Sequence, residues 1–356
     1  MFGVGKINDP RLVRRYIEQG MCDIVNLSRQ SIADPDFPKK MLAGRDDEIR
    51  KCIYCNWCLW TASQGNWTVE CAINYEQGRS REAQITKAEK PKRVLVVGGG
   101  VGGMEAARVS NLRGHDVTLW EKGPQLGGLA AMVSSMPKIF VRSLKNPVQW
   151  LSRHLKKQKV KVELNREVTV EAVEEAKPDV VLVATGSRPA SPDIPGVNSD
   201  NVFTMDDYLA GKAKLGQKVA VLGGGYASEI AVSIARGGKE VALISEGGFD
   251  SLTAAPYLFD GLRNLMLFGF LAEVKAITDV KYKEITKEGV KYVDAEGKEQ
   301  LVSADTVILA TGRVPNRELY DALVGKVPEL YDIGDCWRPD KIGTAIHDAA
   351  RIARHI

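Results

Sequence analysis

Four cysteines lie close together in the first quarter of the chain. Cys52, Cys55, Cys58 and Cys71 are spaced C-x2-C-x2-C-x12-C. Structural zinc sites usually draw on two separated pairs of ligands. Three cysteines at three-residue intervals, closed by a distant fourth, are typical of iron–sulfur clusters of the ferredoxin kind. The spacing therefore predicts a [4Fe–4S] cluster, with a zinc site and a redox disulfide as the alternatives.

The residues around these cysteines have less certain roles. Trp57, Trp60 and Trp67 could shield a cluster from water, or they could simply fill a small core. Cys22 lies on an apolar run and is expected to be a buried small residue. Cys336 follows a Gly-Asp turn and has no obvious ligand partner.

A glycine-rich turn follows the apolar strand RVLVV. Its glycines, Gly98, Gly100 and Gly103, form the pattern G-x-G-x-x-G and open a predicted helix. They allow, in order, a tight turn, close approach of a pyrophosphate, and close helix–strand packing. Glu121 ends the next strand, where a carboxylate can accept hydrogen bonds from an adenosine ribose. This combination predicts an adenine-nucleotide site.

A second turn departs from the pattern in two places. It has Gly223 and Gly225, but Ser228 stands at the third glycine position. Its following strand ends in Ser245, and Glu246 comes one residue late, which turns the carboxylate to the opposite face. An NAD(H) site is therefore uncertain here, and the alternative is a structural domain that has lost its ligand.

The elements that must position these residues form a repeat. Residues 92–109 resemble residues 217–234, and residues 180–189 resemble residues 307–316. Strands alternate with helices from Arg93 onward, which indicates parallel sheets. The sequence predicts an α/β fold with two nested Rossmann-like dinucleotide-binding domains.

Composition excludes several classes of protein. The chain of 356 residues has 44% hydrophobic and 26% charged residues and a net charge of +4, with no basic cluster. Nucleic-acid binding would need a concentrated basic face, and a membrane helix would need roughly 18 apolar residues in a row. No signal peptide is evident, so we expect a cytoplasmic protein whose cysteines are ligands or buried thiols.

Several stretches together resemble a known family. They are the VGK…DP start, SRQSIADPDFPKKMLAGR, IRKCIYCNWC, GGGVGG, both ATG turns and IGDC. In this order they resemble the iron–sulfur flavoproteins built on an old-yellow-enzyme barrel. That family includes trimethylamine, dimethylamine and histamine dehydrogenases, 2,4-dienoyl-CoA reductase and related enoate reductases.

The resemblance implies cofactors and further site residues. FAD, or ADP in its place, would occupy the first glycine turn, and FMN would occupy the barrel, with Arg29 on its phosphate. Lys6 stands where relatives usually have Arg. In two-nucleotide flavoproteins an Asp such as Asp335 hydrogen-bonds the ribityl–phosphate part of FAD, a role compatible with capping the next helix. The matched motifs add four further candidate nucleotide contacts, namely Lys122, Gly128, Thr185 and Gly186.

The resemblance also implies an incomplete barrel. Only its last strand–helix portion is present, and a parallel barrel cannot close without its other strands. We therefore expect a companion polypeptide that supplies the rest, or a truncated gene. The expected parts are a barrel remnant (1–50), a cluster segment (51–89), an FAD/ADP-binding domain (90–212 and 305–356) and an NAD-binding-like domain (213–304).

Three functions fit the resemblance. The cysteine spacing and the weakened second turn favour an amine dehydrogenase that passes electrons from a flavin to electron-transferring flavoprotein or a similar carrier. The alternative is an NADH-dependent enoate or 2,4-dienoyl-CoA-type reductase, in which electrons flow in the reverse direction through FAD and the cluster to FMN. The third is a non-catalytic electron-transfer or assembly subunit.

Overall fold

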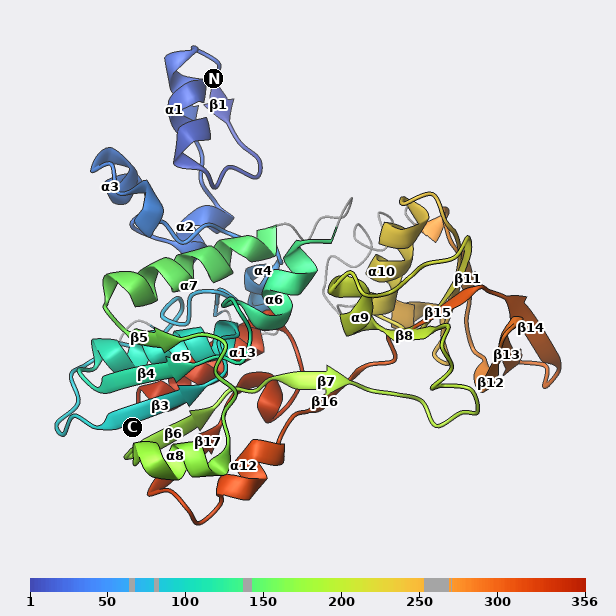
Figure 1. Ribbon diagram of the computed structural model, residues 1–356. Helices are drawn as coiled ribbons and strands as arrows, with labels where there is room; N and C mark the ends of the chain where they lie inside the picture. Colours follow the sequence, from blue (N-terminus) through green and yellow to red (C-terminus); the bar gives the residue numbers. More distant parts are fainter. Residues whose placement is uncertain (64–67, 80–82, 137–142, 253–268, 270) are drawn as a thin grey trace. The chain divides into compact units, whose positions relative to one another are not determined.

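The computed structural model describes residues 1–63, 68–79, 83–136, 143–252, 269 and 271–356 (Figure 1). The chain divides into two compact units. Unit 1 contains the described residues of 1–134, 143–187 and 315–356, and most of unit 2 is formed by the described residues of 188–314.

Unit 1 is built on a five-stranded parallel sheet with the order β17-β6-β3-β4-β5. Its central strands, such as RVLVV and VVLV, are almost continuously apolar because helices cover both faces of the sheet. The strands are β3 (Arg93–Val97), β4 (Asp116–Trp120), β5 (Lys161–Glu163), β6 (Val180–Val183) and β17 (Glu329–Asp332).

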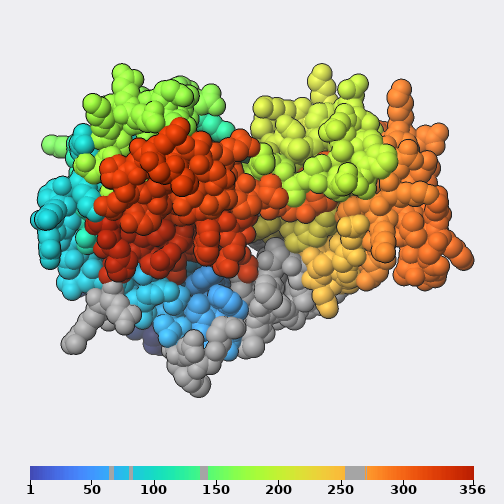
Figure 2. Space-filling model, turned by 90° about the horizontal axis from the view of Figure 1, so that it is seen from below, coloured from blue at the N-terminus to red at the C-terminus, as the bar shows by residue number. Residues whose placement is uncertain are grey.

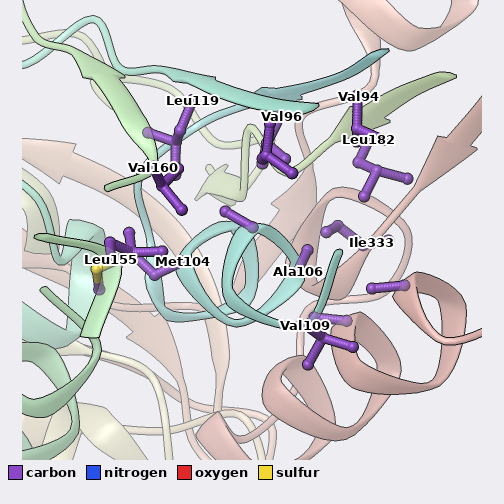
Figure 3. Close-up of a cluster of buried hydrophobic side chains, with 14 of the residues drawn as sticks. Val94, Val96, Met104, Ala106, Val109, Leu119, Leu155, Val160, Leu182 and Ile333 are labelled. Atoms are coloured by element: carbon purple, nitrogen blue, oxygen red, sulfur yellow. The ribbon is translucent and has the colours of Figure 1, made fainter. Parts of the chain in front are cut away.

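Alternate residues of these strands enter two cores. Val94, Val96 and Leu182 point to one face, where they meet Met104 of α5 and Leu155 of α7 (Figure 3). The other face packs against α8 and α12. The helices of unit 1 after the cysteine segment are α5 (Val101–Leu112), α6 (Gly128–Ser134), α7 (Lys145–Lys157), α8 (Val170–Ala176), α12 (Glu318–Leu323) and α13 (Ile342–Ala353), with a 3-10 turn η4 (Gly334–Cys336).

The C-terminal segment completes unit 1. Helix α13 packs along α5, with Ala345 beside Gly102 at the first glycine turn and the Ile356 carbonyl accepting from Arg113 at the far end of α5. On the surface, the red C-terminal residues adjoin blue and cyan residues from the N-terminal half of the chain (Figure 2). This part of unit 1 therefore depends on segments more than 200 residues apart in sequence.

The N-terminal residues form short elements within unit 1. Two strands of two residues each pair in parallel, and small helices follow them. Asp9 caps the first helix by accepting from the backbone N–H of Arg11. These elements are β1 (Phe2–Gly3), α1 (Pro10–Glu18), β2 (Ile24–Val25), α2 (Arg29–Ala33), α3 (Phe37–Leu42), η1 (Asp46–Glu48) and α4 (Trp57–Ser63).

Unit 2 repeats the pattern of unit 1. A parallel sheet has the order β11-β10-β9-β15-β8, and an antiparallel sheet has the order β12-β13-β14. The elements are β8 (Val202–Thr204), α9 (Met205–Leu209), β9 (Lys218–Leu222), α10 (Tyr226–Ala235), β10 (Glu240–Ile244), η3 (Phe249–Leu252), β11 (Lys275–Ile277), β12 (Lys281–Thr286), β13 (Gly289–Val293), β14 (Glu299–Ser303) and β15 (Thr306–Leu309).

The chain passes between the units at a pair of short strands, β7 (Ser187–Pro189) and β16 (Arg313–Pro315). Strands β8 and β15 pair with one another, and β15 also pairs with β9, so the structure places residues 188–212 and 305–314 with unit 2. The predicted parallel α/β architecture with Rossmann-type units is confirmed. Among the described residues, no helix is both long and apolar enough to cross a membrane.

Candidate cysteine and nucleotide sites

The four clustered cysteines line a single pocket. Cys52 and Cys55 lie on the loop before α4, Cys58 lies in the first turn of α4, and Cys71 lies at a β-bridge with Asn74. All four are free thiols. The pocket also has Arg29, Trp57 and apolar residues in its wall. The fold therefore brings together the thiols that the spacing predicts to act as one ligand set.

Buried amides hold the cysteine loop in place. The Gln30 side chain donates to the Arg50 carbonyl at 3.0 Å and accepts from the Cys52 N–H at 2.8 Å. Tyr54 and Asn56 have φ values of 57° and 61°, in the left-handed region that non-glycine residues rarely adopt. This backbone winds the loop tightly enough to place three cysteines around one pocket.

The thiols are in an environment that opposes free thiolates. Burial raises the pKa of the Cys55 thiol to about 12 and that of Cys71 to about 11, and it also raises the pKa values of Cys52 and Cys58. Backbone N–H groups act in the opposite direction, such as that of Tyr54, which donates to the Cys52 Sγ at 3.3 Å. If the four cysteines act as thiolate ligands, a cationic metal centre is needed to offset their charge.

Two arginines supply part of that positive charge. The Arg29 charge lowers the pKa values of Cys52 and Cys58, and the buried Arg50 lowers that of Cys71, although burial outweighs both. Arg29 also donates to the Asn56 Oδ1 at 2.6 Å and lies 5.3 Å from the Tyr54 ring centroid. The structure thus places Arg29 in the wall of the cysteine pocket.

These features fit a cluster of several atoms. Four sulfurs surround one pocket, amide N–H groups donate to the cysteine sulfurs, and the buried Nε1 of Trp57 has no hydrogen-bond partner among the described residues. Hydrogen bonds from amides to sulfur are typical of iron–sulfur sites.

The first glycine turn has the close contacts that its sequence predicts. A Cβ on Gly98 would lie 2.3 Å from the Ala184 carbonyl oxygen, and one on Gly103 would lie 1.9 Å from that of Gly98. Among the described residues, no atom beyond its own neighbours comes within 4 Å of the Cβ position of Gly100. Gly128, at the start of α6, lies against the Gly100 Cα. Space for a pyrophosphate therefore remains at the N-terminus of α5.

Glu121 lies beside this turn. Its two carboxylate oxygens accept from the backbone N–H groups of Gly99 and Gly123, each at 2.6 Å. The carboxylate is thus fixed at the carboxyl end of β4, where an adenosine ribose is expected. Lys122 is exposed next to it.

Three further candidates lie at the ends of β6 and β17. The Thr185 hydroxyl donates to the Asn316 carbonyl at 2.7 Å, and Gly186 has a φ of 73°. Asp335 accepts from the Ser187 hydroxyl at 3.0 Å, ahead of α13. Together with Glu121 they border the carboxyl edge of the sheet, along which dinucleotides bind in such folds.

One hydrophobic cluster joins the cysteine pocket to the first nucleotide turn. Cys52 and Cys71 pack with Ile346 of α13, and Val101 at the start of α5 lies against the same cluster. The two predicted cofactor sites are therefore neighbours within unit 1.

The second glycine turn is covered by its own chain. The Gly225 N–H, which would face a pyrophosphate, donates to the Ser251 carbonyl at 2.8 Å. The Ser228 hydroxyl donates to the Leu252 carbonyl at 2.7 Å, and the Ser245 and Ser251 hydroxyls are 3.0 Å apart. The two serines that depart from the motif thus hold η3 against the turn.

Of the other motif positions, Gly223 keeps the expected geometry, whereas Glu246 does not face the turn. Gly223 makes the close approach expected of a first glycine, since a Cβ there would lie 2.1 Å from the Ala310 carbonyl oxygen. Glu246 accepts from the backbone N–H of Tyr282, at the start of the antiparallel sheet, rather than from the turn.

Sequence reasoning missed Ser251 and the left-handed residues of the cysteine loop. Ser251 contacts Gly225, 26 residues earlier in the sequence, and Ser245, 6 residues earlier. These contacts leave no local sequence pattern. A signal for the loop existed in Asn56, because Asn adopts left-handed backbone more readily than most residues. Trp67 lies outside the described residues.

The chain belongs to the family of pyridine nucleotide-disulphide oxidoreductases, whose model matches residues 77–177 and 140–349. Membership of this family implies binding of FAD or NAD(P).

Its relatives include both reductases and amine dehydrogenases. Cinnamate reductase from Clostridium sporogenes is 34% identical over 99% of this chain and 52% of its own length. Dimethylamine dehydrogenase from a Hyphomicrobium species is 28% identical over 99% of this chain and 54% of its own length. A structure of 2-naphthoyl-CoA reductase in complex with 2-naphthoyl-CoA is 33% identical, with a TM-score of 0.91 over 98% of this chain and 53% of that one. The chain spans about half the length of these relatives.

Proposed function

We propose that this chain is the electron-relaying part of an iron–sulfur flavoprotein oxidoreductase. Cys52, Cys55, Cys58 and Cys71 would hold a [4Fe–4S] cluster, and the first glycine turn would hold FAD or ADP. When bound, the cluster would supply one-electron transfer and the flavin two-electron transfer. The observation behind the proposal is that the four thiols line one pocket, whose core continues to Val101 at the nucleotide turn.

The experiment is analysis of anaerobically purified protein. Iron and acid-labile sulfide are measured per chain, and the nucleotide released on denaturation is identified by chromatography. A flavin or ADP together with iron and sulfide supports the proposal. If nucleotide but no iron is found, the chain is a dinucleotide-binding protein and the electron relay is excluded.

For the direction of electron flow, we propose a reductase in which NADH is the electron donor and an activated C=C bond is the electron acceptor. The support is sequence identity: 34% to cinnamate reductase and 33% to 2-naphthoyl-CoA reductase, against 28% to dimethylamine dehydrogenase. In this direction NADH would need to displace Ser251 from the Gly225 N–H.

The second candidate is an amine dehydrogenase that delivers electrons to electron-transferring flavoprotein or a similar carrier. The cysteine spacing favours this candidate. The covered second turn also favours it, because an amine dehydrogenase does not need NADH to bind there. Anaerobic addition of NADH separates the two: bleaching of the flavin absorbance supports the reductase. Bleaching by an N-methylated amine but not by NADH supports the dehydrogenase, and a response to neither supports a non-catalytic electron-transfer or assembly role.

We also propose a companion polypeptide that supplies the remainder of an FMN barrel, with Arg29 next to the FMN phosphate. Support comes from apolar residues that are exposed in the N-terminal segment. Phe2 and Val4 are 69% and 68% exposed, and Leu42 is 82% exposed. A sheet of two short strands also has unpaired edges. Co-purification of a barrel protein with the tagged chain would support this, whereas a stable monomer that retains FMN by itself would exclude it.

A further inference from the structure

The side chain of Trp57 lies between the cysteine pocket and helix α13. It is in the wall of the four-cysteine pocket. Its Cε3 and Cζ3 atoms lie 3.0 Å from the place that a Cβ on Gly343 would take, at the start of α13. Helix α13 follows Asp335 and borders the nucleotide edge of the sheet. Gly343 lets the ring lie directly on the helix backbone, since any larger residue there would displace it.

The side chain of Trp57 has one polar atom, Nε1. The Nε1–H of Trp57 is buried and has no hydrogen-bond acceptor among the described residues. A buried donor without an acceptor is rare in native proteins, and a redox role or a bound ion is among the explanations for one. Nε1 is on the edge of the indole opposite Cε3 and Cζ3, so it faces away from Gly343.

Resting on the proposed function, we infer that Trp57 donates a hydrogen bond from Nε1 to the iron–sulfur cluster and raises its reduction potential. A hydrogen bond to sulfur stabilises the reduced, more negative cluster more than the oxidised one. The opposite edge fixes the indole against Gly343, so α13 determines where the N–H points. Trp57 is a positioning and tuning residue for the cluster.

The matched comparison is provided by Trp60. Its ring packs edge-to-face on Trp57, with 5.0 Å between centroids, but Trp60 is outside the pocket wall. It is also an indole on the same helix, α4. Trp60→Phe therefore removes similar bulk next to the site without removing the inferred hydrogen bond.

The experiment is a potentiometric titration of the cluster, followed by electron paramagnetic resonance, on the full chain. Trp57→Phe should favour the oxidised cluster by about tenfold, a shift of about 59 mV to more negative potential. Trp60→Phe should leave the potential unchanged. No shift in Trp57→Phe with iron retained, or an equal shift in both variants, would overturn the inference.

A second variant guards against loss of the cluster in Trp57→Phe. Benzothienylalanine incorporated at position 57 keeps the ring shape and replaces the N–H with sulfur. It should retain iron and show the same negative shift, and an unshifted potential here would also overturn the inference. Absence of iron and sulfide from the wild-type chain, in contrast, would refute the proposed function itself.

Discussion

The Ser228 hydroxyl donates a hydrogen bond of 2.7 Å to the backbone carbonyl of Leu252. Ser228 occupies the place of the third glycine in a dinucleotide motif, and the neighbouring Ser251 carbonyl accepts from the Gly225 N–H. A residue that departs from the motif therefore helps to keep the chain over the turn. The serine at the third glycine position and the covering of the turn by η3 are thus linked by a hydrogen bond.

Ser228→Gly should strengthen NADH binding to unit 2. The variant restores the glycine and removes one neutral hydrogen bond that holds η3, worth about 0.5–1.5 kcal/mol, so affinity should rise about 2- to 10-fold. Isothermal titration with NADH measures this change. Ser233→Gly, on the same helix but with its serine close to Tyr208, is the control. Weaker or unchanged binding in Ser228→Gly would show that the contact does not restrict the site.

Cys55→Ser should abolish the cluster and leave the nucleotide in place. Serine is a harder ligand than thiolate, and the first glycine turn is held by backbone contacts that do not involve Cys55. Visible absorbance, iron content and released nucleotide are measured on the same sample. The control is Cys22→Ser, since Cys22 is buried outside the pocket. Equal loss of iron in both variants would indicate general destabilisation.

Glu121→Ala should weaken retention of the nucleotide. Removal of one charged hydrogen-bond acceptor costs roughly 1.5–3 kcal/mol, or about 10- to 150-fold in affinity. Retention after gel filtration, followed by quantification of the adenine nucleotide, measures this loss. Glu175→Ala, an exposed glutamate on α8, should retain the nucleotide. Unchanged retention in Glu121→Ala would mean that the carboxylate only braces Gly99 and Gly123.

In folded, cluster-free protein the Cys55 thiol should be slow to alkylate. Burial raises its pKa from about 9 to about 12, so at pH 8 the thiolate is about 10³-fold scarcer than in the unfolded chain. Because the folded pKa is the higher one, the stability due to the neutral thiol is complete below pH 9. It is lost as the pH rises through 12. Mass spectrometry of iodoacetamide-treated protein should show a rate that still rises above pH 10, and a plateau near pH 9 would contradict this.

Much of the fold could be predicted from local patterns. The apolar strands before Gly98 and Gly223 each become the central part of a parallel sheet, and each glycine turn packs against an Ala-Thr-Gly turn, as the repeat suggests. These features depend on short stretches of sequence, whose periodicity and glycines limit the backbone to few conformations.

Other features could not be predicted because they depend on contacts distant in sequence. Strand β8 joins unit 2 through pairing with β15, about 100 residues later, which no local pattern encodes. The same holds for Gln30, which braces the Cys52 backbone from 22 residues away, and for Trp57 on Gly343. Spacing predicted which cysteines lie together, but only the packing shows that α13 lies beside them.

The most direct test of the account is the metal content of anaerobically purified chain. Four irons and four acid-labile sulfides per chain, lost in Cys55→Ser and kept in Cys22→Ser, are the expected result. One zinc per chain, or no metal together with four alkylatable thiols, would contradict the electron relay.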